Sequence, residues 1–227
     1  MMDVKDLREA RDELLLATLP HVPFDGWTPK AMREGARSLG QDRTLPERLF
    51  PGGVVEMVDH FSDYADRLMV EDLALETAEE MRLRDRIKTV IRLRLERWAP
   101  EREAVRRAAT LLALPQNAPV ALRATYRTVD TMWYAVGDRS VDFSFYTKRA
   151  SLAAVFSSTL LYWMEDQSEG FEETWGFLDR RLEDIMRIPK IKAKINQGLS
   201  YLPNPLRLMP GFSPAPRPRR FGIDGRF

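Results

Sequence analysis

The residues best suited to chemistry are few in this sequence and far apart. It has no cysteine and only two histidines, His21 and His60, in 227 residues. Cysteine and histidine supply most zinc and transition-metal ligands, and many nucleophiles and general bases. We therefore expect no metal, no cofactor and no catalytic residue, and hence a protein that is not an enzyme.

Carboxylates that share one predicted helix near residue 180 do not alter this expectation. Di-iron sites in helical bundles combine such carboxylates with histidines, and no histidine is nearby. We interpret this group as a solvated helix face. A glycine-rich phosphate loop, a serine nucleophile elbow and an HExxH pair are also missing from the sequence. The carboxylates are Glu172, Glu173, Asp179, Glu183 and Asp184.

Aromatic and small hydroxyl residues concentrate between residues 130 and 167. From Ala150 to Met164 no residue is charged, so this predicted helix is buried on nearly all sides, lines an apolar cavity, or faces a second copy of itself. It is too short for a membrane span, which needs about 18 apolar residues. Core packing explains many of the aromatics. A cavity would instead hold an extended apolar ligand and recognise one polar end. The candidate lipid-binding residues are Trp133, Tyr134, Leu152, Val155, Phe156, Leu160 and Trp163.

Every element that must position this stretch is predicted to be a helix. Prolines, glycines and capping residues divide the chain into helices, and Thr28 before Pro29 is a typical N-cap pair. We expect an all-α fold with four parts. These are a helix-turn-helix-like head at 1–53, a lipid-binding and dimerisation domain at 54–189, an apolar arm at 190–212, and a disordered Pro/Arg-rich tail at 213–227.

Three of the predicted helices carry apolar stripes. The stripe within residues 81–98 comprises Leu83, Ile87, Val90, Ile91, Arg94 and Trp98. Two later stripes alternate steps of four and three, as in coiled coils, and favour packing on neighbours or a two-fold dimer. They comprise Leu122, Tyr126, Val129, Trp133 and Val136, and Phe171, Trp175, Leu178, Leu182 and Ile185.

The net charge and the terminal residues limit which location and which partners we expect for the protein. The net charge of +1 gives no global field for nucleic acid. The first 20 residues lack a secretion signal, and their acidic residues do not suit a mitochondrial presequence. We therefore expect a protein that is made and kept in a bacterial cytoplasm, or one from which a leader has already been trimmed. Between residues 190 and 227, apolar residues followed by arginines would suit an anionic membrane surface, or residues 190–212 would pack as an arm.

The first three predicted helices and a long fourth one resemble the DNA-binding head of TetR-type regulators. The resemblance covers Trp27 to Phe61 and makes residues 42–50 the recognition helix. That segment has Arg43 and Arg48 offset by acidic residues and contains Pro46, so we expect no nucleic-acid partner. A ligand-responsive TetR-type transcription regulator is the alternative hypothesis.

A second resemblance follows from the order GDRSVDFSFYTKRASLAAV at residues 137–155 and FEETWGFLDRR at 171–181. This stretch, about a third of the chain, resembles the ubiquinone-biosynthesis accessory protein family, the ninth of the Coq proteins. That family has a TetR-type fold without evident DNA-binding function. The resemblance implies a homodimer that binds isoprenoid lipid and presents quinone intermediates to a di-iron quinone hydroxylase, peripheral to the inner membrane.

The same resemblance implies two further surfaces. Partner binding falls on Asp130, Met132, Asp142, Phe145 and Tyr146, where family members often have tryptophan in place of Phe145. Membrane contact falls on a final amphipathic helix, which Pro203, Pro205 and Pro210 interrupt in this chain. The apolar residues retained there are Leu199, Tyr201, Leu202, Leu206 and Leu208.

Overall fold

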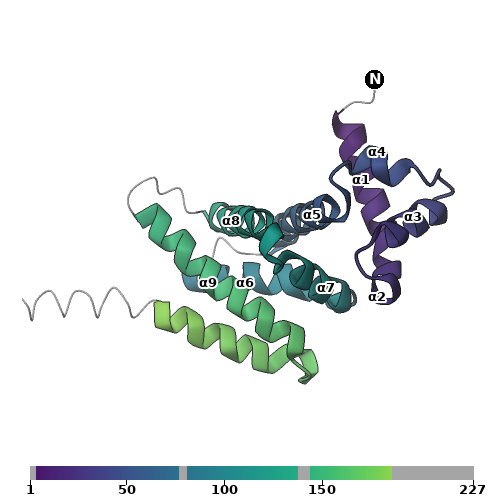
Figure 1. Cartoon of the computed structure of the whole chain (residues 1–227). Coiled ribbons are helices and arrows are strands. Elements are labelled where there is room, and N and C mark those ends of the chain that lie inside the picture. The colour runs from purple at the N-terminus through teal and green to yellow at the C-terminus, as the bar shows by residue number, and fades with distance from the viewer. Residues whose placement is uncertain (1–3, 77–80, 138–143, 186–227) are drawn as a thin grey trace, which may run out of the picture. The chain divides into compact units, whose positions relative to one another are not determined.

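Helices and their connections make up residues 4–76, 81–137 and 144–185, which are the residues that the computed structural model describes (Figure 1). No strand occurs in these ranges. The prediction of an all-α fold is therefore confirmed.

The N-terminal head consists of short helices. Helix α1 spans Val4–Thr18. Helix α3 (Pro29–Ser38) begins where the Thr28–Pro29 pair predicts it, and the Thr28 hydroxyl caps it by accepting the N–H of Ala31 at 3.3 Å. The single-turn helix α2 (Val22–Asp25) lies between them, since Pro23 near its start fixes a helical φ angle.

The helix predicted at 42–50 is shorter in the structure. It is the five-residue α4 (Leu45–Leu49), because the Asp42 side chain accepts the N–H of Thr44 at 2.9 Å and forms a turn before it. The prediction that residues 42–50 form one recognition helix is therefore wrong in extent.

Helices α1 and α3 cross at a glycine. A Cβ added at Gly35 would lie 2.5 Å from the hydroxyl oxygen of Thr18 and 2.9 Å from its backbone nitrogen. Thr18 is fully buried, and its hydroxyl donates to the carbonyl of Leu14 at 2.7 Å. Only a residue without a side chain allows this approach, so Gly35 fixes how closely the two helices of the head pack.

The long helix α5 (Gly53–Leu75) leads out of the head and packs against α6 and α8 (Figure 1). Helix α8 also packs against α9. One continuous core of buried apolar residues runs from Leu14 in the head to Leu182. The remaining helices are α6 (Leu83–Glu96), α7 (Arg102–Leu112), α8 (Ala118–Ala135), α9 (Ser144–Glu165) and the helix at 172–185.

A buried carboxylate joins α9 to helix 172–185. Asp166 accepts hydrogen bonds from the backbone N–H and hydroxyl of Ser168, at 2.7 and 2.6 Å, and from those of Thr174, at 2.9 and 2.6 Å. Burial of Asp166 opposes ionisation, but these four hydrogen bonds outweigh it and lower its pKa to about 2. The ionised carboxylate thus caps the start of helix 172–185.

By its internal contacts the chain divides into Met1–Ile185 and Met186–Phe227. The predicted arm at 190–212 and tail at 213–227 lie outside the described residues. None of the helices in the described ranges combines the length and apolar character needed to cross a membrane.

Candidate functional site

A pocket of about 270 Å³ lies between α5 and the later helices of the body. Apolar side chains from α5, α7 and α9 form most of its wall, together with small alanines of α7 and α8. Its polar lining is confined to Ser62, Arg94, Thr125 and Thr128. The larger wall residues are Val58, Phe61, Val105, Leu112, Phe156 and Leu160.

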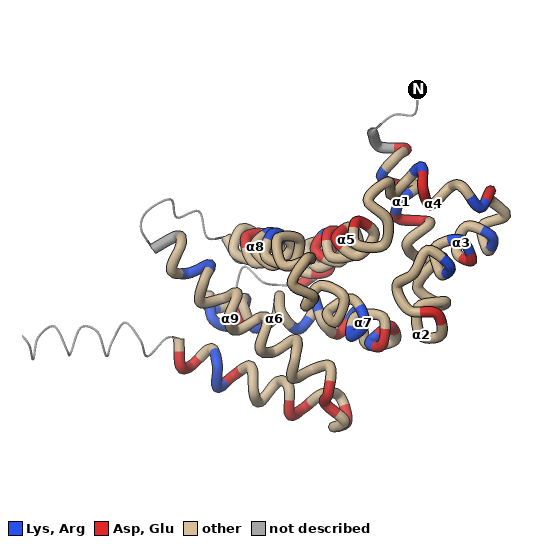
Figure 2. Tube along the Cα trace, in the orientation of Figure 1, with Lys and Arg blue, Asp and Glu red and all other residues tan. Residues whose placement is uncertain are grey.

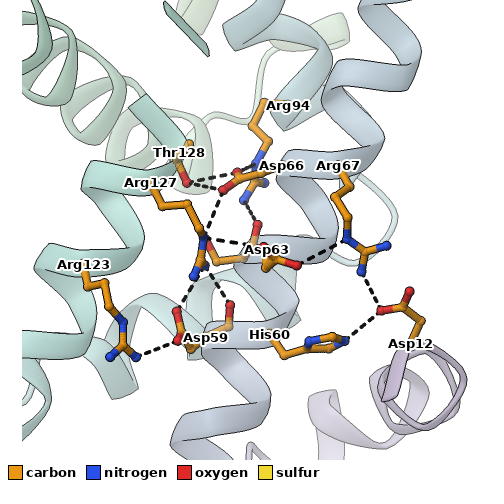
Figure 3. Close-up of polar contacts among 11 residues, drawn as sticks. Asp12, Asp59, His60, Asp63, Asp66, Arg67, Arg94, Arg123, Arg127 and Thr128 are labelled. Carbon is orange, nitrogen blue, oxygen red and sulfur yellow. Dashed lines mark hydrogen bonds and ion pairs between the residues drawn. The ribbon is translucent and has the colours of Figure 1, made fainter. Parts of the chain in front are cut away.

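A buried ion pair between Arg94, which lines this pocket, and Asp66 adjoins the pocket. Figure 3 shows the polar contacts of this pair. The Nε of Arg94 donates to a carboxylate oxygen of Asp66 at 2.9 Å, and the hydroxyl of Thr128 lies 2.8 and 2.9 Å from the two oxygens of that carboxylate. The side chain of Arg94 is 11% exposed and that of Asp66 is 4% exposed. Burial raises the pKa of Asp66, and the charge and hydrogen bond of Arg94 oppose this most strongly.

The ion pair continues along α5 as a ladder of carboxylates that face α8 (Figure 3). Arg127 of α8 lies 3.7 Å from Asp66, 3.8 Å from Asp63 and 3.1 Å from Asp59. Arg123, one turn earlier on α8, lies 2.7 Å from Asp59. These contacts hold α5 and α8 in register beside the pocket.

On another side of α5, the network reaches the head. His60 and Arg67 both contact Asp12 of α1 at 2.7 Å (Figure 3). Burial is the largest influence on His60 and lowers its pKa from the usual 6.5, which favours the neutral ring. Arg67 also lies 3.3 Å from Asp63, so one cluster connects the head with the pocket side of α5.

The predicted lipid-binding residues do not form one surface. Phe156 and Leu160 line the pocket. Tyr134 is 71% exposed on α8, away from the pocket lining. The others are buried in the core and are Trp133, Leu152, Val155 and Trp163.

The predicted partner-binding residues are divided as well. Tyr146 is 71% exposed, and Asp130 is partly exposed and accepts a 2.6 Å hydrogen bond from Arg149 of α9. Met132 is fully buried, so the prediction that it contributes to a contact surface disagrees with this fold. Asp142 and the side chain of Phe145 lie outside the described residues, as do the predicted membrane contacts at 199–208.

The uncharged stretch of α9, Ala150 to Met164, is not buried on nearly all sides within one chain. Tyr146, Ala150, Ala154 and Leu161 follow one another at helical spacing and are exposed. On α8, the C-terminal half of the predicted stripe is buried within the same chain, whereas Leu122 and Tyr126 are 71% and 51% exposed. Homodimer formation stays a prediction, and these are the apolar surfaces open to it.

The head carries charges of both signs (Figure 2). Lys30 pairs with Asp25 at 2.7 Å, Arg33 with Glu47 at 3.5 Å, and Arg37 with Glu34. These pairs reduce the positive potential that phosphate contacts require. No group of histidine, cysteine and acidic residues within 4–76, 81–137 and 144–185 could hold a metal ion.

The sequence patterns predicted no function for Arg94, Asp66 or Thr128. The sequence nevertheless contained an indication of a buried arginine, because Arg94 occupies a position in the apolar stripe of residues 81–98. A buried arginine requires a carboxylate or other acceptor. The acceptor here, Asp66, lies on α5, far from Arg94 in the sequence. Only the packing of α6 on α5 brings the two together.

The comparisons with known proteins agree with this fold. The COQ9 family model matches residues 118–189, which include α8 and α9. Ubiquinone biosynthesis protein COQ9, mitochondrial, of Rattus norvegicus is 35% identical over 193 residues, covering 82% of this chain and 62% of that protein. Residues 118–189 therefore match the COQ9 family, and the chain as a whole is similar to COQ9 proteins. The protein of the same name from Drosophila melanogaster is 37% identical over 195 residues, covering 84% of this chain and 59% of the relative.

The chain thus spans about three fifths of the length of those curated relatives. These relatives are mitochondrial proteins of eukaryotes, so the predicted location in a bacterial cytoplasm, peripheral to the inner membrane, is wrong by this comparison. A crystal structure of a TetR transcriptional regulator from Nitrosomonas europaea ATCC 19718 matches with a TM-score of 0.61 and 22% identity. It covers 76% of this chain and 95% of the regulator, which confirms the TetR-like fold.

Proposed function

We propose that this chain is a non-enzymatic accessory protein of ubiquinone biosynthesis. In this role it binds isoprenoid quinone intermediates and presents them to a di-iron quinone hydroxylase at a membrane surface. The observation that carries the proposal is the match over more than four fifths of the chain to proteins named for ubiquinone biosynthesis. The mainly apolar pocket beside α9 supports lipid as the ligand class.

The proposed mechanism is presentation rather than catalysis. Each CH₂ group moved from a bilayer into water costs about 0.8 kcal/mol, so an unassisted lipid rarely brings its head group to a soluble enzyme. A protein that covers part of the lipid lowers this cost. The walls formed by Phe61, Phe156 and Leu160 would contact the apolar part of the ligand, and no residue need react with it.

The proposed partners follow from the exposed surfaces. Tyr134, Tyr146 and the partly exposed Asp130 lie on the surface near the ends of α8 and α9, where the hydroxylase would bind. A second copy of the chain would cover some of the remaining apolar surface as a homodimer. Leu202 and Leu206 would contribute membrane contact from residues outside the described ranges.

Native mass spectrometry of the purified chain tests lipid binding, with extraction and identification of any bound molecule. We expect an isoprenoid lipid that co-purifies or that binds on addition of a short-tailed isoprenoid quinone. Ala109→Phe would place a large ring in the pocket and should abolish this binding, because Ala109 lines the pocket. Ala118→Phe is the matched control, since Ala118 is exposed and absent from the lining. A wild-type chain that stays free of lipid after this addition contradicts the proposal.

A further inference from the structure

The volume of the pocket restricts which part of a lipid it accepts. Engineered protein cavities of about 150 Å³ bind benzene, and pockets for drug-sized ligands begin near about 300 Å³. The volume here, about 270 Å³, therefore suits one substituted six-membered ring and is too small for a long polyprenyl chain. The ring end of an isoprenoid quinone meets this limit.

The guanidinium of Arg94 has donor capacity that the fold does not use. Its Nε donates to Asp66 at 2.9 Å, and Nη2 lies 3.4 Å from the carbonyl oxygen of Ser62. Nη1 has no hydrogen-bond partner among the described residues, and it is not sealed off as a buried, unsatisfied atom. Since Arg94 lines the pocket, the N–H groups of Nη1 are available to an acceptor inside it.

The charge balance of the surrounding cluster favours an uncharged acceptor. Arg67, Arg94, Arg123 and Arg127 are joined by ion pairs to an equal number of aspartates, and burial favours the neutral ring of His60. A ligand anion placed next to Asp66 would add an unpaired buried charge, which is strongly unfavourable. The aspartates are Asp12, Asp59, Asp63 and Asp66.

We propose that this pocket binds the ring of a neutral quinone or phenol, with Arg94 donating a hydrogen bond to a ring oxygen, while the isoprenoid tail stays outside. This inference rests on the proposed function and adds which end of the ligand enters and which residue recognises it. Asp66 and Thr128 act as positioning residues, because they hold the guanidinium at the pocket edge.

Calorimetric titration of the full chain with three probes tests the assignment. The probes are dimethoxy-methyl-benzoquinone, which is a tail-free ring, farnesol, which is a ring-free isoprenoid, and laurate, which is anionic. Arg94→Lys keeps the charge opposite Asp66 but removes the guanidinium fork. Arg92→Lys is the control on the same helix, because Arg92 is not part of the pocket lining.

The expected result is that the benzoquinone binds the wild-type chain more tightly than laurate does. Arg94→Lys should weaken benzoquinone binding about tenfold to a hundredfold, the effect of losing a hydrogen bond from a charged donor, and Arg92→Lys should not. If Arg94→Lys is too unstable to assay, the double variant Asp66→Asn/Arg94→Gln removes both charges together and should show the same loss.

Three outcomes overturn this assignment while leaving the proposed function in place. They are equal benzoquinone affinity in wild type and the Arg94 variants, binding of farnesol without benzoquinone, and tighter binding of laurate than of benzoquinone. Failure of farnesol, benzoquinone and natural lipid alike to bind overturns the proposed function as well.

Discussion

Replacing Arg94 with methionine is expected to destabilise the fold by about 3–5 kcal/mol, the range found when one partner of a buried ion pair is removed. Arg94 and Asp66 are 11% and 4% exposed in their side chains. Without the guanidinium, the carboxylate of Asp66 keeps the hydroxyl of Thr128 at 2.8 Å and the more distant Arg127 at 3.7 Å. These contacts do not replace a direct ionic hydrogen bond for a charge held away from water.

Urea and thermal unfolding of the full chain measure this loss. In a domain of this size each kcal/mol shifts Tm by about 2–4 °C, so Arg94→Met should lower Tm by about 6–20 °C. Arg92→Met, which removes a surface pair with Glu96, should change stability by about 1 kcal/mol or less. The double change Asp66→Asn/Arg94→Met should recover most of the loss, because it leaves no unpaired charge.

The stability deficit of Arg94→Met should depend on pH with a defined sign. Burial already raises the pKa of Asp66, and removal of Arg94 takes away the strongest opposing influence, so this pKa rises further. The folded variant then keeps a proton that the unfolded chain has lost above about pH 3.9. The deficit is therefore smallest in acid and grows as pH rises through the raised pKa. A variant as stable as wild type at pH 7, or a deficit that grows toward acid, refutes this account of the ion pair.

Three further predictions concern packing and polar junctions. Gly35→Ala should destabilise the fold by about 1–3 kcal/mol, because the new Cβ would lie 2.9 Å from the backbone nitrogen of Thr18. Gly176→Ala should instead stabilise the fold by about 0.5–1 kcal/mol. Urea unfolding midpoints that shift in the same direction for both variants contradict this prediction. Asp166→Asn should lower stability by about 1–3 kcal/mol at neutral pH. Its Tm deficit should vanish as the pH falls from about 4 to about 2, because the lowered pKa of Asp166 adds stability only above that window. A Tm deficit that does not change with pH argues against the capping role. The ring of His60 should titrate below 6.5 by NMR, because burial lowers its pKa. The contribution of the neutral ring to stability is then lost as pH falls through that lowered pKa. A titration midpoint above 6.5 contradicts the burial of His60 as a neutral imidazole.

Local chemistry made most of the fold predictable. Thr28 followed by Pro29 located the start of α3, and prolines or glycines marked most other helix boundaries within a few residues. The prediction of a helix at 42–50 was wrong in extent because an Asx turn at Asp42 competes with the helix. From sequence alone, an aspartate that forms such a turn is hard to distinguish from one that caps a helix.

The site was less predictable than the fold because contacts between distant helices decide it. Phe156 and Leu160 were predicted as ligand contacts and line the pocket. Trp163, a large apolar residue of the same helix with the same prediction, is fully buried in the core. Periodicity assigns a residue to a helix face and leaves open whether that face meets a cavity or a neighbour. Arg94 is the clearest case, since its polar partner lies 28 residues away on α5.

The pocket volume also limits how presentation can work. At about 0.8 kcal/mol per exposed CH₂, a polyprenyl tail left in water would cost far more than a ring in a pocket of about 270 Å³ could return. The tail of a bound quinone must therefore remain in the bilayer or lie on other apolar surface, such as the exposed Leu122 and Tyr126 of α8. A protein that held only the ring would consequently work while docked on the membrane. Titration of a long-tailed quinone in vesicles separates these routes, because tail coverage by α8 predicts weaker binding in Leu122→Asp, and retention in the bilayer predicts no change.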